Sequence, residues 1–126
     1  MIRTIILTSQ SKRMHYIQAQ LKVYVTRTYQ RCPIYKTERF GIFGCPKSIS
    51  DQWINDPKKS QSEYWNHLNE LKYTNDEFIN TIQRFASYRS VLLLCFCENP
   101  ALCHRVVLAE WLINSFPNLF IAGEFL

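Results

Sequence analysis

The chain has 126 residues, which is enough for one hydrophobic core and too few for two domains of useful size. Hydrophobic residues make up 47% and charged residues 20%, and these shares exclude a disordered chain, a collagen and a simple coiled coil. The net charge of +5 is unevenly distributed: residues 1–47 carry nine Lys and Arg against one acid (+8), and residues 48–126 carry six against nine (−3). A basic amino-terminal third indicates either a face that meets an anion or basic side chains that are merely solvated.

The cysteine count and the absence of long apolar runs indicate the cellular compartment of the protein. Five cysteines are an odd number and cannot all pair within the chain. The apolar run at residues 1–8 is too short for a signal peptide, and no stretch approaches the roughly 18 apolar residues of a membrane span. We therefore expect a cytoplasmic protein without a membrane partner, whose cysteines are thiols, metal ligands or reactive groups.

The first half of the chain predicts two strands and a long connection. Residues 2–8 form a nearly continuous β-branched run, which is typical of a strand buried on both faces. A short helix or an irregular crossover is expected over 14–21, followed by a second strand from Lys22 that ends at Arg27. Residues 27–50 are expected to be irregular, and a loop of about 20 residues is usually functional.

Helices and a central strand are expected in the second half. The predicted helices cover residues 48–55, 60–72 and 75–88, the last of them capped at Thr74 or Asn75. The apolar run at 90–97 predicts the central strand. Asn99 as N-cap and Pro100 as first helical residue predict a helix that ends near Ser115, and a last strand is expected over 119–122.

Strands that alternate with helices favour a parallel sheet with right-handed crossovers. We therefore predict one α/β domain over residues 1–126. It would be a three-layer, Rossmann-like or flavodoxin-like domain with a small, mainly parallel sheet of about four strands and a helical insertion between the second and third strands. Ligands of such sheets bind beyond the carboxyl ends of the strands. This rule places the candidate site at Thr8 and Ser9, Arg27, Cys97 and Glu98.

Chemically active residues are concentrated at 95–105, where the predicted strand leads into the predicted helix. The amide donors of a helix start, together with Arg105, would form an anion pocket. In one interpretation, Cys97 or Cys103 is a thiolate nucleophile activated by these positive groups. Against a Cys–His dyad, Cys103 and His104 are adjacent on the predicted helix and would point about 100° apart.

Two other interpretations use the same segment. Cys97, Cys103 and His104 could ligate zinc, although their spacing matches no common zinc pattern. The candidate fourth ligands are Cys32, Cys45 and His67. Alternatively, the three residues line a nucleotide or phosphate pocket, with Glu98 accepting a hydrogen bond from a sugar or a base.

Several nearby residues have plainer interpretations. Cys95 is expected to be a small buried hydrophobe, and Tyr64 is expected to serve packing. Arg27 either neutralises an anion or forms a salt bridge with Glu98. Aromatic residues interleaved with basic ones at 24–43 would suit stacking on bases beside phosphate contacts.

The run from Leu92 to Leu112 resembles the carboxyl-terminal signature of the domain-of-unknown-function 488 family. In that family an apolar strand leads into Cys and Glu, a short turn, a Cys-His-Arg triplet and an apolar helix. Further matches lie earlier in the chain, at Thr8-Ser9, Val25-Thr26-Arg27, Cys45-Pro46-Lys47-Ser48 and Tyr64. One departure is that many members carry Asp one or two places before the Arg that ends the second strand, where this chain has Val and Thr.

The resemblance implies a small α/β fold and a site formed by the residues that match the motif, namely Cys97, Glu98, Cys103, His104, Arg105 and Arg27. We predict that this site binds a nucleotide-like or other phosphorylated ligand, without a resident cofactor or metal unless zinc is bound. If a reaction occurs, Glu98 or His104 would handle the proton, with Cys103 as the third catalytic candidate, and Arg105 would hold the anion. The alternative is a non-catalytic module that binds nucleic acid or protein through the basic amino-terminal third.

Overall fold

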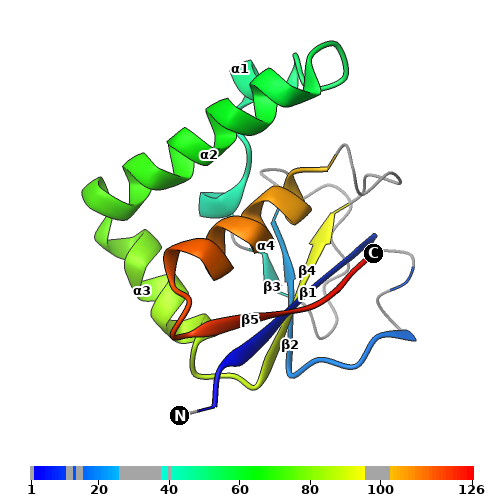
Figure 1. The fold of residues 1–126 in the computed structure, drawn as a ribbon, viewed down its shortest axis with the longest axis vertical. Helices are drawn as coiled ribbons and strands as arrows, with labels where there is room; N and C mark the ends of the chain where they lie inside the picture. The colour runs from blue at the N-terminus through cyan, green and yellow to red at the C-terminus, as the bar shows by residue number, and fades with distance from the viewer. Residues whose placement is uncertain (1, 11–12, 14–15, 26–37, 40, 96–102) are drawn as a thin grey trace.

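The strands form one parallel sheet in a computed structural model that describes residues 2–10, 13, 16–25, 38–39, 41–95 and 103–126 (Figure 1). The strands are β1 (Thr4–Gln10), β2 (Leu21–Tyr24), β3 (Glu38–Arg39), β4 (Ser90–Cys95) and β5 (Phe120–Phe125). Their order across the sheet is β3-β2-β4-β1-β5, and every neighbouring pair is parallel. The predicted α/β class and parallel sheet are therefore confirmed. The described residues contain five strands where about four were expected, because β3 lies in the stretch that was expected to be irregular.

Four α-helices and one 3-10 helix are described. They are η2 (Gly41–Phe43), α1 (Lys47–Ser50), α2 (Pro57–Thr74), α3 (Asp76–Phe85) and α4 (His104–Ser115). In chain order, α1, α2 and α3 fall between β3 and β4, and α4 follows β4. None of the described helices is both long and apolar enough to cross a membrane.

Side-chain caps determine where two of these helices begin. Asp56 accepts a hydrogen bond from the backbone N–H of Lys59 at 3.3 Å, with Pro57 in the first turn, so α2 begins three residues before the predicted start. Asn75 accepts from the backbone N–H of Phe78 at 3.1 Å and caps α3, as predicted. The two helices thus join with almost no loop between them.

Alternating strand residues separate two hydrophobic clusters on the two faces of the sheet. On one face, Ile6, Val23 and Leu93 belong to the large cluster to which α2, α3 and α4 contribute. The members from these helices include Tyr64, Leu68, Phe78, Ile82, Phe85, Leu108 and Trp111. On the opposite face, Leu92 and Leu94 pack with a smaller set that includes residues of segment 16–20. Strand β4 is buried on both faces and lies in the middle of the sheet, as predicted.

The start of α4 differs from the sequence-based expectation. Cys103 is the N-cap residue, with extended backbone angles of φ −109° and ψ 137°, and the helix begins at His104. The predicted continuous helix from Asn99 and Pro100 is therefore wrong, while residues 96–102 lie outside the described part of the chain. An Asn-Pro pair is only a local preference for a helix start, whereas the burial of Cys103 and the anchoring of His104 depend on the sheet.

Candidate functional site

His104 joins the beginning of α4 to the end of β2. Its Nε2 atom lies 2.8 Å from the carbonyl oxygen of Val25, whose own N–H donates to Leu94 in β4 at 3.1 Å. A carbonyl oxygen only accepts hydrogen bonds, so Nε2 carries a hydrogen, and in the neutral form of the ring Nδ1 has the lone pair. That Nδ1 atom lies 3.9 Å from Sγ of Cys95, the last residue of β4. In its neutral form the ring therefore presents an acceptor nitrogen to the buried Cys95.

Cys103 completes what we call the Cys95–Cys103–His104 cluster. The two sulfur atoms and one ring nitrogen of His104 all lie within 4.8 Å of one another. Both cysteines are buried, and His104 is half-buried. The expectation that Cys103 and His104 diverge is wrong, because Cys103 precedes the helix in an extended conformation rather than occupying its first turn.

Tyr64 of α2 forms one wall of this cluster. Its ring meets the ring of His104 edge-on, with centroids 5.8 Å apart, and its hydroxyl donates to the carbonyl oxygen of Phe43. Burial raises the pKa of Tyr64 well above its ordinary value, and nearby thiol charge would raise this pKa further. The cysteines responsible are Cys45, Cys103 and Cys95. Tyr64 is therefore a neutral phenol, in contact with the site as well as with the core.

Arg105, predicted to hold an anion, is completely buried. Its Nε and Nη2 atoms donate to the carbonyl oxygen of Leu126, at 3.2 and 2.7 Å. The N–H of Leu126 in turn donates to the carbonyl oxygen of Thr8 at 3.0 Å, beside β1. Two of the guanidinium donors thus hold the residue that follows β5.

Thr8 and Ser9 lie near the carboxyl end of β1, and both are buried. Ser9 donates its hydroxyl hydrogen to the carbonyl oxygen of Gln10 at 3.0 Å. Within the described residues, the Oγ1 atom of Thr8 has no hydrogen-bond partner. Thr8 is in register with Leu93, which places it on the face of the sheet that α4 covers. The structure brings Thr8 to the predicted edge without showing what it binds.

Three predicted site residues, Arg27, Cys97 and Glu98, lie outside the described residues, as does Cys32. For two aromatic residues of the stretch 24–43, the structure contradicts a role in stacking on bases. Tyr24 is fully buried against Leu92 and Leu94, and Phe43 is fully buried among core aromatic rings that include Phe78 and Phe85.

The sequence-based site missed Cys95. That residue is buried as expected, but its sulfur faces His104 rather than serving only as a small hydrophobe. The signal was present in the strand itself: Val91 and Leu93 belong to the large cluster, so Cys95 two residues further on shares their face.

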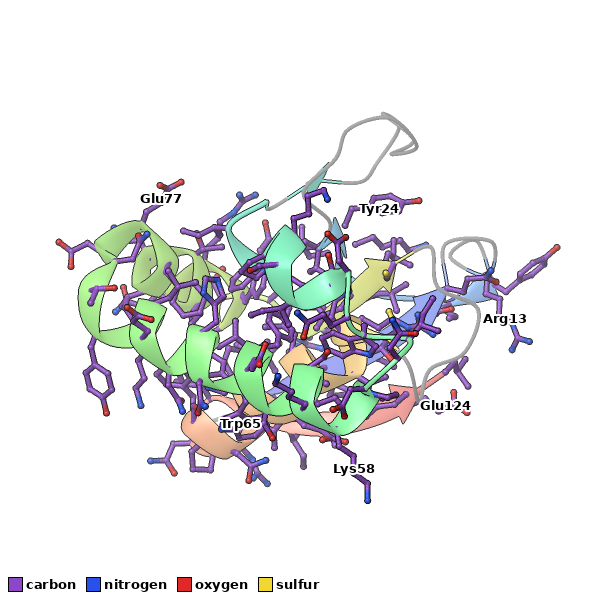
Figure 2. The ribbon with its side chains drawn as sticks, turned by 90° about the horizontal axis from the view of Figure 1, so that it is seen from above. Arg13, Tyr24, Lys58, Trp65, Glu77 and Glu124 are labelled. Carbon is purple, nitrogen blue, oxygen red and sulfur yellow. The ribbon has the colours of Figure 1, made fainter. Side chains whose placement is uncertain are left out.

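A groove between α2 and α4 lies away from this cluster. The groove has a volume of about 550 Å³ and is lined by polar and charged residues that include Lys58 and Glu110, together with Trp65. Figure 2 shows Lys58 and Trp65 on the same side of α2. Neither cysteine of the cluster lines this groove, so the groove gives no support to the Cys95–Cys103–His104 cluster as a reactive site.

The fold and site define a small α/β protein with a parallel sheet that gathers cysteine and histidine where its strands meet the start of a helix. A family model described as Domain of unknown function DUF488 matches residues 42–112, which is more than half of the chain. The chain belongs to this family, and the resemblance inferred from the sequence is confirmed. The matched range includes Tyr64 and the whole Cys95–Cys103–His104 cluster. Comparison with curated proteins and with solved structures found no match.

Proposed function

We propose that the protein binds a nucleotide-like or otherwise phosphorylated small molecule at the carboxyl edge of its sheet, and that Cys103 and His104 take part in processing it. One observation carries this proposal. His104, the first residue of α4, is hydrogen-bonded to Val25 at the end of β2 and lies beside Cys95 at the end of β4. Ligands of parallel α/β sheets bind at this edge, between the strand ends and the following helices.

Electrostatics favour an anionic ligand at this position. Helix α4 has 12 residues, and its first N–H groups have no acceptor within the helix. They carry a partial positive charge that favours phosphate or carboxylate groups. The buried guanidinium of Arg105, in the first turn of α4, adds a permanent positive charge to the same region.

The chain also offers groups that can take part in a reaction. The Nδ1 atom of His104 can accept a proton or hold a metal ion, but not both at once. Glu98 and Arg27, predicted from the sequence to lie at the same edge, are the candidates for a second proton acceptor and a second cation. In this proposal Cys103 supplies a thiol or thiolate beside His104.

Calorimetric titration with nucleoside monophosphates, nucleoside diphosphates and sugar phosphates tests the proposal. We expect one of these probes to bind, and we expect His104→Ala and Cys103→Ala to weaken its binding by about tenfold or more, which is about 1.4 kcal/mol. Glu110→Ala is the matched control, because Glu110 is on the same helix but exposed and lines the groove. Equal affinity in all three variants would contradict the assignment of the site.

Titration with a single-stranded oligonucleotide distinguishes this proposal from the alternative, a module that binds nucleic acid. Binding of a single-stranded oligonucleotide that weakens steeply with salt, yet survives His104→Ala and Cys103→Ala, would assign the function to the basic amino-terminal third instead.

A further inference from the structure

We propose that Cys95, Cys103 and His104 hold one zinc ion and leave one coordination position open. The metal site is inferred from these three side chains alone, and only the assignment of the open position to a phosphorylated ligand rests on the proposed function. Thiolate sulfur and imidazole nitrogen are the ligand atoms that zinc prefers in proteins.

The distances between the three ligand atoms are slightly longer than those around a tetrahedral zinc ion. Tetrahedral zinc with Zn–S of about 2.3 Å and Zn–N of about 2.0 Å separates a sulfur from a nitrogen by about 3.5 Å, and two sulfurs by about 3.8 Å. The Sγ atom of Cys95 lies 3.9 Å from Nδ1 of His104, and all three ligand atoms lie within 4.8 Å of one another. Small side-chain rotations are therefore sufficient to bring the three atoms to a common ion.

The orientation of His104 is an independent indication of a metal site. Histidines that ligate metals typically donate the hydrogen of the other ring nitrogen to a carboxylate or a backbone carbonyl, which fixes the tautomer and the ring orientation. His104 does this through Nε2 to the carbonyl oxygen of Val25, at 2.8 Å. Val25 is itself held by its N–H bond to Leu94, so the acceptor is part of the sheet. Nδ1 is thereby aimed at the sulfur atoms.

The ligands come from well-held elements rather than from separate surface loops. Cys95 ends the central strand β4, in register with Gln10 of β1, and Cys103 and His104 form the cap and first residue of α4. Both sulfur atoms belong to buried residues, and the fully buried ring of Tyr64 packs on His104. A site supported in this way loses little conformational entropy when the ion binds.

The three ligands found among the described residues favour an open coordination position. Three protein ligands with a fourth position for water or substrate are typical of catalytic zinc sites, whereas structural sites have four protein ligands. Among the described residues, no fourth Cys, His, Asp or Glu joins the group, and Cys45 lies outside it. Two thiolates neutralise Zn²⁺, so the start of α4 and Arg105 remain to attract an anion. A phosphate oxygen of the ligand would occupy the open position and be polarised there.

Metal analysis of the full chain, purified without chelators, tests the site directly. We expect inductively coupled plasma mass spectrometry to find about one zinc per chain in the wild type. This zinc should be lost in Cys95→Ser, Cys103→Ser and His104→Ala. Cys45→Ser is the matched control, because Cys45 is another buried cysteine beside Tyr64 and outside the cluster. Cobalt added to the metal-free wild-type protein should give the strong visible bands of a tetrahedral site and a sulfur-to-cobalt charge-transfer band.

Each result supports or overturns the inference. A wild-type protein that neither carries zinc nor gives the cobalt bands would overturn it, whatever the variants do. The cobalt spectrum also decides the matter if a variant fails to fold, since it is recorded on the wild type. Loss of zinc in Cys45→Ser or in Cys97→Ser would overturn the open position by revealing a fourth protein ligand.

Different results would overturn the metal site and the proposed function. Zinc without binding of any phosphorylated probe would leave the metal site standing and remove the proposed function. Equal binding of a probe to zinc-loaded and metal-free protein would instead overturn the assignment of the open position to the ligand.

Discussion

The imidazole of His104 donates from Nε2 to the carbonyl oxygen of Val25 over 2.8 Å, and so joins two residues that are 79 positions apart in the chain. This bond has two consequences. It holds the first residue of α4 against the end of β2, and it directs Nδ1 toward Cys95. The helix start and the orientation of the candidate site are therefore set by the same contact.

The first prediction concerns that contact. His104→Ala removes a partly buried hydrogen bond and the edge-on ring contact with Tyr64, so we expect the free energy of unfolding to fall by about 1–2 kcal/mol. Urea denaturation of metal-free protein measures the change without a contribution from metal binding. Glu110→Ala, an exposed change on the same helix, should leave stability within about 0.5 kcal/mol of the wild type. Equal stability of His104→Ala and wild type would show that the Val25 contact does not hold α4.

The second prediction concerns the buried phenol of Tyr64. Tyr64→Phe keeps the ring but leaves the carbonyl oxygen of Phe43 without this donor, and we expect a loss of about 1 kcal/mol in stability. Tyr73→Phe is the matched control, because Tyr73 is 82% exposed and its hydroxyl can bond to water. Thermal or urea denaturation of the two variants measures this difference. Equal losses of stability would contradict a structural role for the buried hydroxyl of Tyr64.

The third prediction assigns Arg105 to stability. Its buried guanidinium donates twice to the backbone oxygen of Leu126, so Arg105→Ala should lower the free energy of unfolding by about 1.5–3 kcal/mol, a range typical of hydrogen bonds to charged groups. Arg105→Lys keeps the positive charge but loses the paired guanidinium donors, so its stability should lie between that of the wild type and that of Arg105→Ala. Arg89→Ala, an exposed change, should be nearly neutral. An Arg105→Ala protein as stable as the wild type would mean that Arg105 serves the ligand site alone.

The fourth prediction concerns pH. Partial burial lowers the pKa of His67, and the charge of Glu70 opposes this shift with a smaller effect. The unfolded chain, with a histidine pKa of about 6.5, then binds a proton more readily than the folded one. The contribution of neutral His67 to stability is therefore present above that pKa and is lost as the pH falls below it.

We thus expect the unfolding free energy of the wild type to fall from about pH 7 to about pH 5.5 more steeply than that of His67→Gln, in matched urea titrations. Parallel pH profiles for the two proteins would show that His67 titrates equally in both states.

Local patterns were enough to predict much of the fold. The continuous apolar run at 90–97 identified the central strand, observed at Ser90–Cys95, because a strand covered on both faces has no polar side. Asn75, followed by acidic residues and an apolar stripe, identified the start of α3. The alternation of strands and helices indicated a parallel sheet, and that sheet indicated the edge at which a site would form. Each of these inferences needs only neighbours within a few residues.

The composition of the candidate site depended on contacts between distant segments. The sequence alone favoured Cys97 over Cys95 because Cys97 matches the family motif. It separated Cys103 from His104 because both were assigned to an assumed helix. The structure adds Cys95, whose sulfur lies beside His104, and places Cys103 before the helix.

The sequence by itself determined the class of fold, the family, and the sheet edge at which cysteine, histidine and arginine gather, because these follow from periodicity and local motif. Only the tertiary structure decided which of these side chains meet. It assigned two donors of Arg105 to Leu126 and turned His104 toward Cys95. Strand register and helix docking bring such residues together, and neither can be obtained from the local spacing of residues in the chain.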